Sequence, residues 1–278
     1  MQVDIGAIDY FANSGNSFLH RASTKYKIIF VALVIVSVVI TDDFKLLLSV
    51  YLVLTAFITL TRLPVLKIIS IALYPGMFAL LFAIASWNGN WIGSGVIVLK
   101  ALDTALAMVL LIVTTPYPNI FAALRPLLPK IVVEGLFLTY RSIFILLELI
   151  DNLIKALRLR GGLTPGRYLK NIINFSSGIG LLLVRGFDLS ERFYGVMRIR
   201  GYNGKMAEIE SKKLGKRDAA PILVGILVFA LSLADYIRND LGKYYIYALV
   251  VSILSVLITV SYTHIQKNRG LNWKNWSE

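Results

Sequence analysis

Cysteine is absent from the 278 residues of the chain. Disulfides, thiolate metal sites and catalytic thiols are therefore excluded, and the sequence does not mark the redox compartment. Histidine is nearly absent as well: His20 and His264 lie at opposite ends, and neither has a His or Cys partner at the spacing of metal ligands. We therefore expect no metal site built from the side chains of this chain.

The chain also lacks the short motifs of nucleotide and acyl chemistry. No G-x-x-x-x-G-K-[ST] sequence occurs, and the glycine-containing run at 176–180 has no lysine to hold a phosphate. There is no Gly-x-Ser-x-Gly elbow, and the carboxylates are scattered rather than paired. We expect neither a catalytic residue nor a bound cofactor, and a membrane enzyme acting on lipids has no visible catalytic group.

Charged residues are scarce, at 16% of the chain, whereas 57% of the residues are hydrophobic. With a mean hydropathy of +0.71, this composition is that of a polytopic membrane protein. The first apolar run follows some 25 mixed residues without a short basic segment or a small-residue cleavage site. A cleaved signal peptide is therefore not expected.

Six apolar runs predict membrane-spanning helices. Because backbone groups in lipid must be hydrogen-bonded within their own segment, even the Val- and Ile-rich first run is expected to be helical. The chain is thus predicted to be all-α, with four spans in residues 1–115, a cytoplasmic region at 116–218 and a hairpin at 219–278. The predicted spans cover residues 26–41, 44–60, 66–86, 92–114, 219–234 and 244–262.

The basic residues give the orientation of these spans. With the N-terminus inside, the cytoplasmic segments 1–27, 62–67, 116–218 and 264–278 hold 3, 2, 17 and 3 of the 29 Lys and Arg residues. This distribution follows the positive-inside rule and predicts a cell-membrane protein with both termini in the cytoplasm. The net charge of +13 is then explained by topology and by attraction to anionic lipid, so no nucleic-acid partner is expected.

Two long amphipathic helices are predicted in the cytoplasmic region. Four prolines between 116 and 129 interrupt any continuous helix there. After them, the apolar background is broken at intervals of seven residues by Glu134, Arg141, Glu148 and Lys155, which predicts a helix with a narrow polar stripe. A similar run at 171–198 follows. Neither helix is expected to be immersed in lipid.

Each of these helices ends in the same phrase. Leu157-Arg158-Leu159-Arg160-Gly161 and Met197-Arg198-Ile199-Arg200-Gly201 stand forty residues apart. A basic last turn followed by glycine is also an ordinary helix ending, because it suits the helix dipole and the left-handed cap. Two such endings, each presenting an arginine with its fork of donors, favour a docking surface for two copies of a partner.

Intramembrane charge offers a different function. Lys100 and Asp103 lie three residues apart within the fourth span, where they could pair on one helical face. A pair that braces the helical bundle is the simpler explanation. The alternative is a self-sufficient secondary transporter or channel that uses this pair, although broken helices at matching places in two halves are not evident.

The Arg-Gly pair, in a polytopic chain without a nucleotide motif, resembles the T component (EcfT) of energy-coupling-factor transporters. The N-terminal phrases Ile8-Asp9-Tyr10-Phe11-Ala12, Asn16-Ser17-Phe18-Leu19-His20 and Thr24-Lys25-Tyr26-Lys27 are similar to those of its cobalt-type CbiQ branch. The resemblance covers most of the chain, and the Arg-Gly pair is its most specific element.

This resemblance implies a non-catalytic subunit that works with two ABC ATPases and a separate substrate-binding membrane subunit. ATP and Mg would be bound by the ATPases, and the solute, whether cobalt, nickel or a vitamin, by the other subunit. The family motif is Ala-Arg-Gly, so Arg160 and Arg200 are implied to dock on the ATPases, together with Gly161, Gly201 and the neighbouring Arg158 and Arg198. Leu159 and Ile199 stand where the family has alanine.

Overall fold

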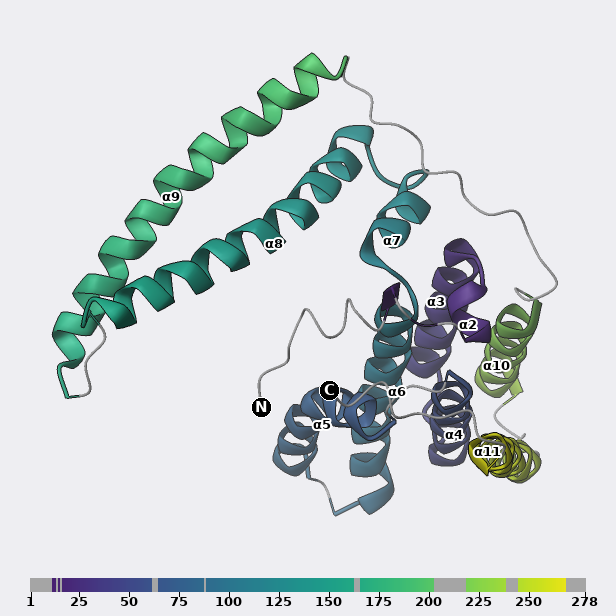
Figure 1. The fold of residues 1–278 in the computed structure, drawn as a ribbon. Coiled ribbons are helices and arrows are strands. Elements are labelled where there is room, and N and C mark those ends of the chain that lie inside the picture. Colours follow the sequence, from purple (N-terminus) through teal and green to yellow (C-terminus); the bar gives the residue numbers. More distant parts are fainter. Residues whose placement is uncertain are drawn as a thin grey trace. The chain divides into compact units, whose positions relative to one another are not determined.

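The computed structural model describes residues 12–13, 15, 17–61, 65–87, 89–162, 166–202, 219–238 and 245–268 (Figure 1). Within these ranges every regular element from α2 (Phe18–Arg21) onward is an α-helix, which confirms the all-α prediction. The N-terminal phrase at 8–11, Thr164-Pro165 and the basic loop at 203–217 lie outside the described residues.

Residues 1–123 and 211–278 form one compact unit. In it, α6 packs against three neighbours, α3, α4 and α5, while α10 packs on α3 and α11 on α4. Fully buried side chains such as Phe30, Leu47 and Leu106 fill the core between them. The helices are α3 (Thr24–Ile40), α4 (Phe44–Leu60), α5 (Val65–Ala85), α6 (Trp91–Thr114), α10 (Ala219–Arg238) and α11 (Tyr245–Asn268).

Local signals explain where these helices begin. The Asp43 side chain accepts a hydrogen bond from the Lys45 backbone N–H at 2.7 Å and thereby caps α4. Asn90 caps α6 in the same way, by accepting from the N–H of Ile92 at 3.1 Å. The six apolar runs form the helices α3, α4, α5, α6, α10 and α11, with ends that shift by a few residues.

Residues 124–210 form the second unit. After α7 (Tyr117–Leu124) and the prolines that follow it, α8 (Lys130–Leu159) and α9 (Tyr168–Ile199) make a long antiparallel hairpin, seen in teal and green in Figure 1. Arg141 lies over the ring of Phe193 at 5.2 Å. Farther along the hairpin, a Cβ at Gly178 would come within 2.9 Å of the Leu153 side chain, so the two helices meet closely there.

Three helices of the described residues are long and apolar enough to cross a membrane. Two, α5 and α6, were expected to do so, but the third is α9. Its stretch from Asn171 to Val184 carries no charge, and all its basic and acidic residues except Lys170 lie beyond it. The expectation that no segment within 116–218 has the composition of a membrane span was therefore wrong for α9.

Candidate functional site

The first Arg-Gly phrase folds into a helix-ending turn. Gly161 adopts a left-handed φ of 66°. Its N–H donates to the Arg158 carbonyl at 3.1 Å, and the Gly162 N–H reaches back to the Leu157 carbonyl at 2.8 Å. These two bonds are those of a Schellman motif, which needs glycine at the left-handed position. Arg160 is consequently the C-cap residue of α8, and its side chain is exposed.

The second phrase folds in the same way at the end of α9. Gly201 has a φ of 78°, its N–H donates to the Arg198 carbonyl at 3.1 Å, and the Tyr202 N–H donates to the Met197 carbonyl at 3.0 Å. Arg200 is the exposed C-cap residue. Both glycines are thus helix terminators, as expected, and the two arginines have equivalent backbone surroundings. We call residues 157–162 and 197–202 the first and second tip.

The antiparallel hairpin places the two tips at its opposite ends. The second tip lies beside the start of α8, because Tyr202 contacts Glu134, whereas the first tip follows the last residue of that helix. Leu159 lies 25 residues after Glu134, which is about 38 Å along the axis at the rise of an α-helix. The sequence repeat alone did not reveal this separation.

Each tip is held by a side chain interaction with the other helix. Asn174 of α9 donates through Nδ2 to the carbonyl of Gly162 at 2.9 Å. In turn, the Tyr202 hydroxyl donates to Oε2 of Glu134, in α8, at 2.7 Å. The hydrogen bond to Glu134, together with desolvation and the carboxylate charge, raises the pKa of Tyr202 above 10.0. The phenol therefore remains a neutral donor below that pH.

The polar stripe predicted on α8 is only partly a solvated face. Glu134 is buried and contacts Tyr202 of the second tip, and Arg141 lies over Phe193 in the second half of α9. Lys155 instead pairs with Asp151 one turn earlier, at 2.6 Å, in an exposed pair of small energetic weight. Two of the four residues in the seven-residue series, Glu134 and Arg141, thus contact the other arm of the hairpin and help to align it with α8.

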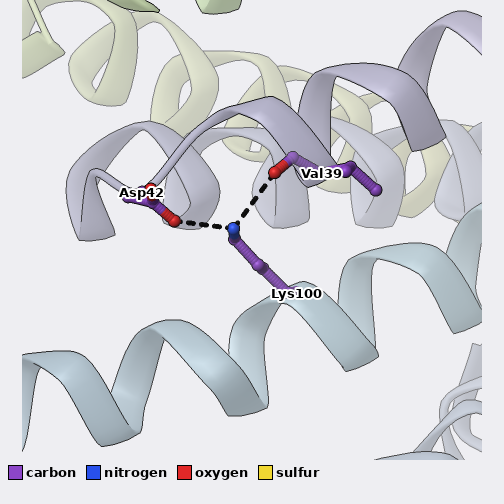
Figure 2. A network of polar contacts seen from close by, with 3 residues as sticks. All are labelled: Val39, Asp42 and Lys100. Atoms are coloured by element: carbon purple, nitrogen blue, oxygen red, sulfur yellow. Dashed lines mark hydrogen bonds and ion pairs between the residues drawn. The ribbon is translucent and has the colours of Figure 1, made fainter.

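The expected pairing of Lys100 with Asp103 does not form. Figure 2 shows that Lys100 Nζ reaches the end of α3 instead, where it donates to Asp42 Oδ1 at 2.7 Å and to the Val39 carbonyl at 3.2 Å. Asp42 belongs to the turn between α3 and α4 and is largely exposed. Lys100 therefore lies level with a polar turn and caps a neighbouring helix, which the i,i+3 spacing alone could not show.

Asp103 is left without this partner. Its side chain is fully buried within the first unit, and neither carboxylate oxygen has a hydrogen-bond partner among the described residues. Tyr51 of α4 is close enough to interact with it electrostatically. A buried carboxyl group without a donor is energetically costly, and within a membrane bundle such a group is a candidate functional position.

A second lysine, missed in the sequence, mirrors Lys100. Lys27, near the start of α3, is buried and donates to the Thr114 carbonyl at 2.9 Å and to the Thr115 hydroxyl at 3.0 Å. It thereby caps the C-terminal end of α6. In the sequence, Lys27 is only one of the basic residues assigned to the cytoplasm. The feature that could have singled it out is its position in the first turn of an apolar helix.

The part of the chain that the structure describes contains no cluster of three His, Asp or Glu side chains suited to a metal ion. The cobalt transport protein family CbiQ matches residues 15–210. The chain belongs to the CbiQ family.

The CbiQ match includes α3 to α6 and both tips, and it ends before α10. An uncharacterized protein of Methanocaldococcus jannaschii is 28% identical over 124 residues. That match covers 44% of this chain and 42% of the relative, which is under half the length of each. Together with the apolar helices, CbiQ membership makes this chain a membrane protein of a cobalt transport family.

Proposed function

We propose that this chain is the energy-coupling subunit of an ATP-driven importer of the energy-coupling-factor type. Arg160 and Arg200 dock two ABC ATPase subunits, with Arg158, Arg198 and the terminating glycines completing each tip. The observation that carries the proposal is the repeated geometry: two identical Schellman endings present exposed arginines at the two ends of one hairpin. Two equivalent sites about 38 Å apart fit two copies of one partner.

The proposal divides the work of transport among several proteins. ATP and Mg are bound and hydrolysed in the ATPases, and this chain is not catalytic. A separate membrane subunit binds the solute, for which CbiQ membership favours cobalt, while nickel or a vitamin remains an alternative. The exposed apolar side chains along α9, among them Ile172, Ile173 and Phe187, suit contact with lipid or with that subunit.

Co-purification from a mild detergent tests the docking role. The full chain, expressed together with a pair of ABC ATPases, is expected to retain both ATPases. The double variant R160E/R200E is expected to lose them, because each arginine is replaced by the opposite charge. R185E/R192E is the matched control, since both arginines are exposed in α9 but lie outside the tips. A complex of R160E/R200E that still couples ATP hydrolysis to uptake would contradict the proposal.

A transporter that acts alone is the second candidate, and the observation that favours it is the buried Asp103 carboxyl, which has no hydrogen-bond partner among the described residues. Proteoliposomes that contain only this chain provide the test. Flux of cobalt or nickel that is lost in D103N would support this candidate, and the absence of flux would count against it. Lys100 pairs with Asp42 instead of Asp103, so the Lys100–Asp103 ion pair that such a transporter would use does not form.

A further inference from the structure

Leu159 and Ile199 are large apolar side chains at equivalent places in the two tips. Each is the last residue of its helix and directly precedes the C-cap arginine. Their exposed fractions are 89% and 88%, which are the highest values among the exposed large hydrophobic side chains of the described residues. A single exposed leucine needs no explanation, but the same exposure at the same position in two identical turns does.

The backbone fixes the direction of both side chains. The Schellman bonds hold each turn, and Asn174 and Tyr202 tie the tips to the opposite helices. Leu159 lies between Arg158 and Arg160, and Ile199 between Arg198 and Arg200. Each tip therefore presents one apolar side chain flanked in sequence by two guanidinium groups on a rigid support.

The surroundings of the tips indicate the chemistry of the partner. Residues 155–170, which include the first tip, contain five basic residues and no acidic one, and residues 192–202, which include the second tip, contain three basic residues and no acidic one. A partner must therefore offer carboxylates beside an apolar pocket. The matching geometry of the two tips points to two copies of one folded protein, because a fluid bilayer would accept an apolar side chain from turns of any shape.

We propose that Leu159 and Ile199 are apolar anchors that insert into a pocket on each ATPase subunit and select ATPases whose pocket admits a large side chain. The inference rests on the proposed function, because it names the side chains that give the docking arginines their specificity. An aliphatic side chain that fills a pocket at the centre of an interface contributes binding energy, whereas exposed charges contribute more to the rate and orientation of association.

Binding of a purified ATPase pair to the full chain in nanodiscs tests this inference. L159A and I199A are each expected to weaken binding by about tenfold, which is about 1.4 kcal/mol, and the double variant by more. L159M, which preserves volume, is expected to bind nearly as well as the wild type. L127A is the control, because Leu127 is also 82% exposed but lies outside the tips. Truncation of such exposed side chains should not disturb folding.

The salt dependence of binding distinguishes the contribution of the apolar side chains from that of the arginines. Between about 0.1 and 0.5 M salt, the loss caused by L159A/I199A is expected to stay constant, whereas the loss caused by R160A/R200A should shrink as charges are screened. If the wild type does not bind the ATPases, the proposed function fails. If it binds and L159A/I199A binds equally well, the anchor inference alone is overturned. It is also overturned if L159A/I199A retains the ATPases and loses only binding to anionic lipid vesicles.

Discussion

Lys27 holds its ammonium group inside the first unit, against the carbonyl end of α6. K27M keeps the length of the side chain and removes both hydrogen bonds, which leaves the Thr114 carbonyl without this donor. We expect a loss of about 1–3 kcal/mol in the free energy of unfolding, measured by thermal or denaturant unfolding in detergent. K25M is the control, because Lys25 is exposed two residues away. Equal stability of the two variants would contradict the role of Lys27 as a cap.

Whereas Lys27 is expected to stabilise the first unit, the buried carboxyl group of Asp103 is expected to destabilise it. Its carboxyl group is buried without a hydrogen-bond partner among the described residues, so replacement by an apolar side chain removes an unfavourable group. D103L, which has a similar shape and no polar atom, is expected to stabilise the bundle by about 1–3 kcal/mol, seen as a higher Tm in detergent. E148Q, which alters an exposed acid of α8, should leave the Tm unchanged. A lower Tm for D103L would mean that the carboxyl group is bonded in the folded protein.

At the scale of the helix, the two tips depend on glycine at a left-handed position. G161A and G201A place a Cβ at φ values of 66° and 78°, at a cost of about 1 kcal/mol each. We expect the last helical turn to fray, with faster amide hydrogen exchange there and weaker binding of the ATPases. G180A is the control: Gly180 lies within α9 with open space around it, so alanine should be neutral or slightly stabilising.

The contact between Tyr202 and Glu134 joins the end of α9 to the start of α8. Y202F removes the hydroxyl alone, so amide exchange across residues 196–202 should become about two- to tenfold faster. Because folding raises the pKa of Tyr202, the contact is fully present below pH 10.0 and is lost as the pH rises past the raised value. Y194F changes an exposed tyrosine of the same helix and should have no effect.

Helix endings are the part of the structure that the sequence predicts best. Gly161 and Gly201 act through their own backbone preference and terminate α8 and α9, and Pro129 stands directly before the first residue of α8. Partners distant in the sequence were not predictable in this way. Lys100 pairs with Asp42, 58 residues away, because the packing of α6 on α3 brings the end of α3 within reach of its flexible side chain.

The apolar character of α9 shows a second limit of sequence patterns. Charges at Arg185, Asp188 and Arg192 predict an amphipathic helix, but they lie in its second half, and the first half reads as a membrane span. Composition averaged over 32 residues conceals that change. Arg160 and Arg200 were found through the repeated phrase, and their role in docking stays a prediction until binding is measured.

At the scale of the whole molecule, the hairpin makes a prediction that can be tested by distance measurement. Because the chain has no cysteine, R158C/R198C introduces the only two thiols for spin labels. The antiparallel register predicts a separation of about 30–40 Å by double electron–electron resonance. Labels at residue 158 in α8 and residue 185 in α9 provide a shorter reference distance, because residue 185 lies nearer to the first tip than residue 198 does. A separation below about 20 Å for R158C/R198C would mean that the tips lie together.

The contacts of Lys27 and Lys100 also bear on how the first unit can deform. Lys27 ties the start of α3 to the end of α6, and Lys100 ties α6 to the end of α3. If α3 slid along α6 by one helical turn, about 5.4 Å, both ties would break at once. The pair therefore resists shear along its axis, and during any transport cycle α3 and α6 should travel as a single body.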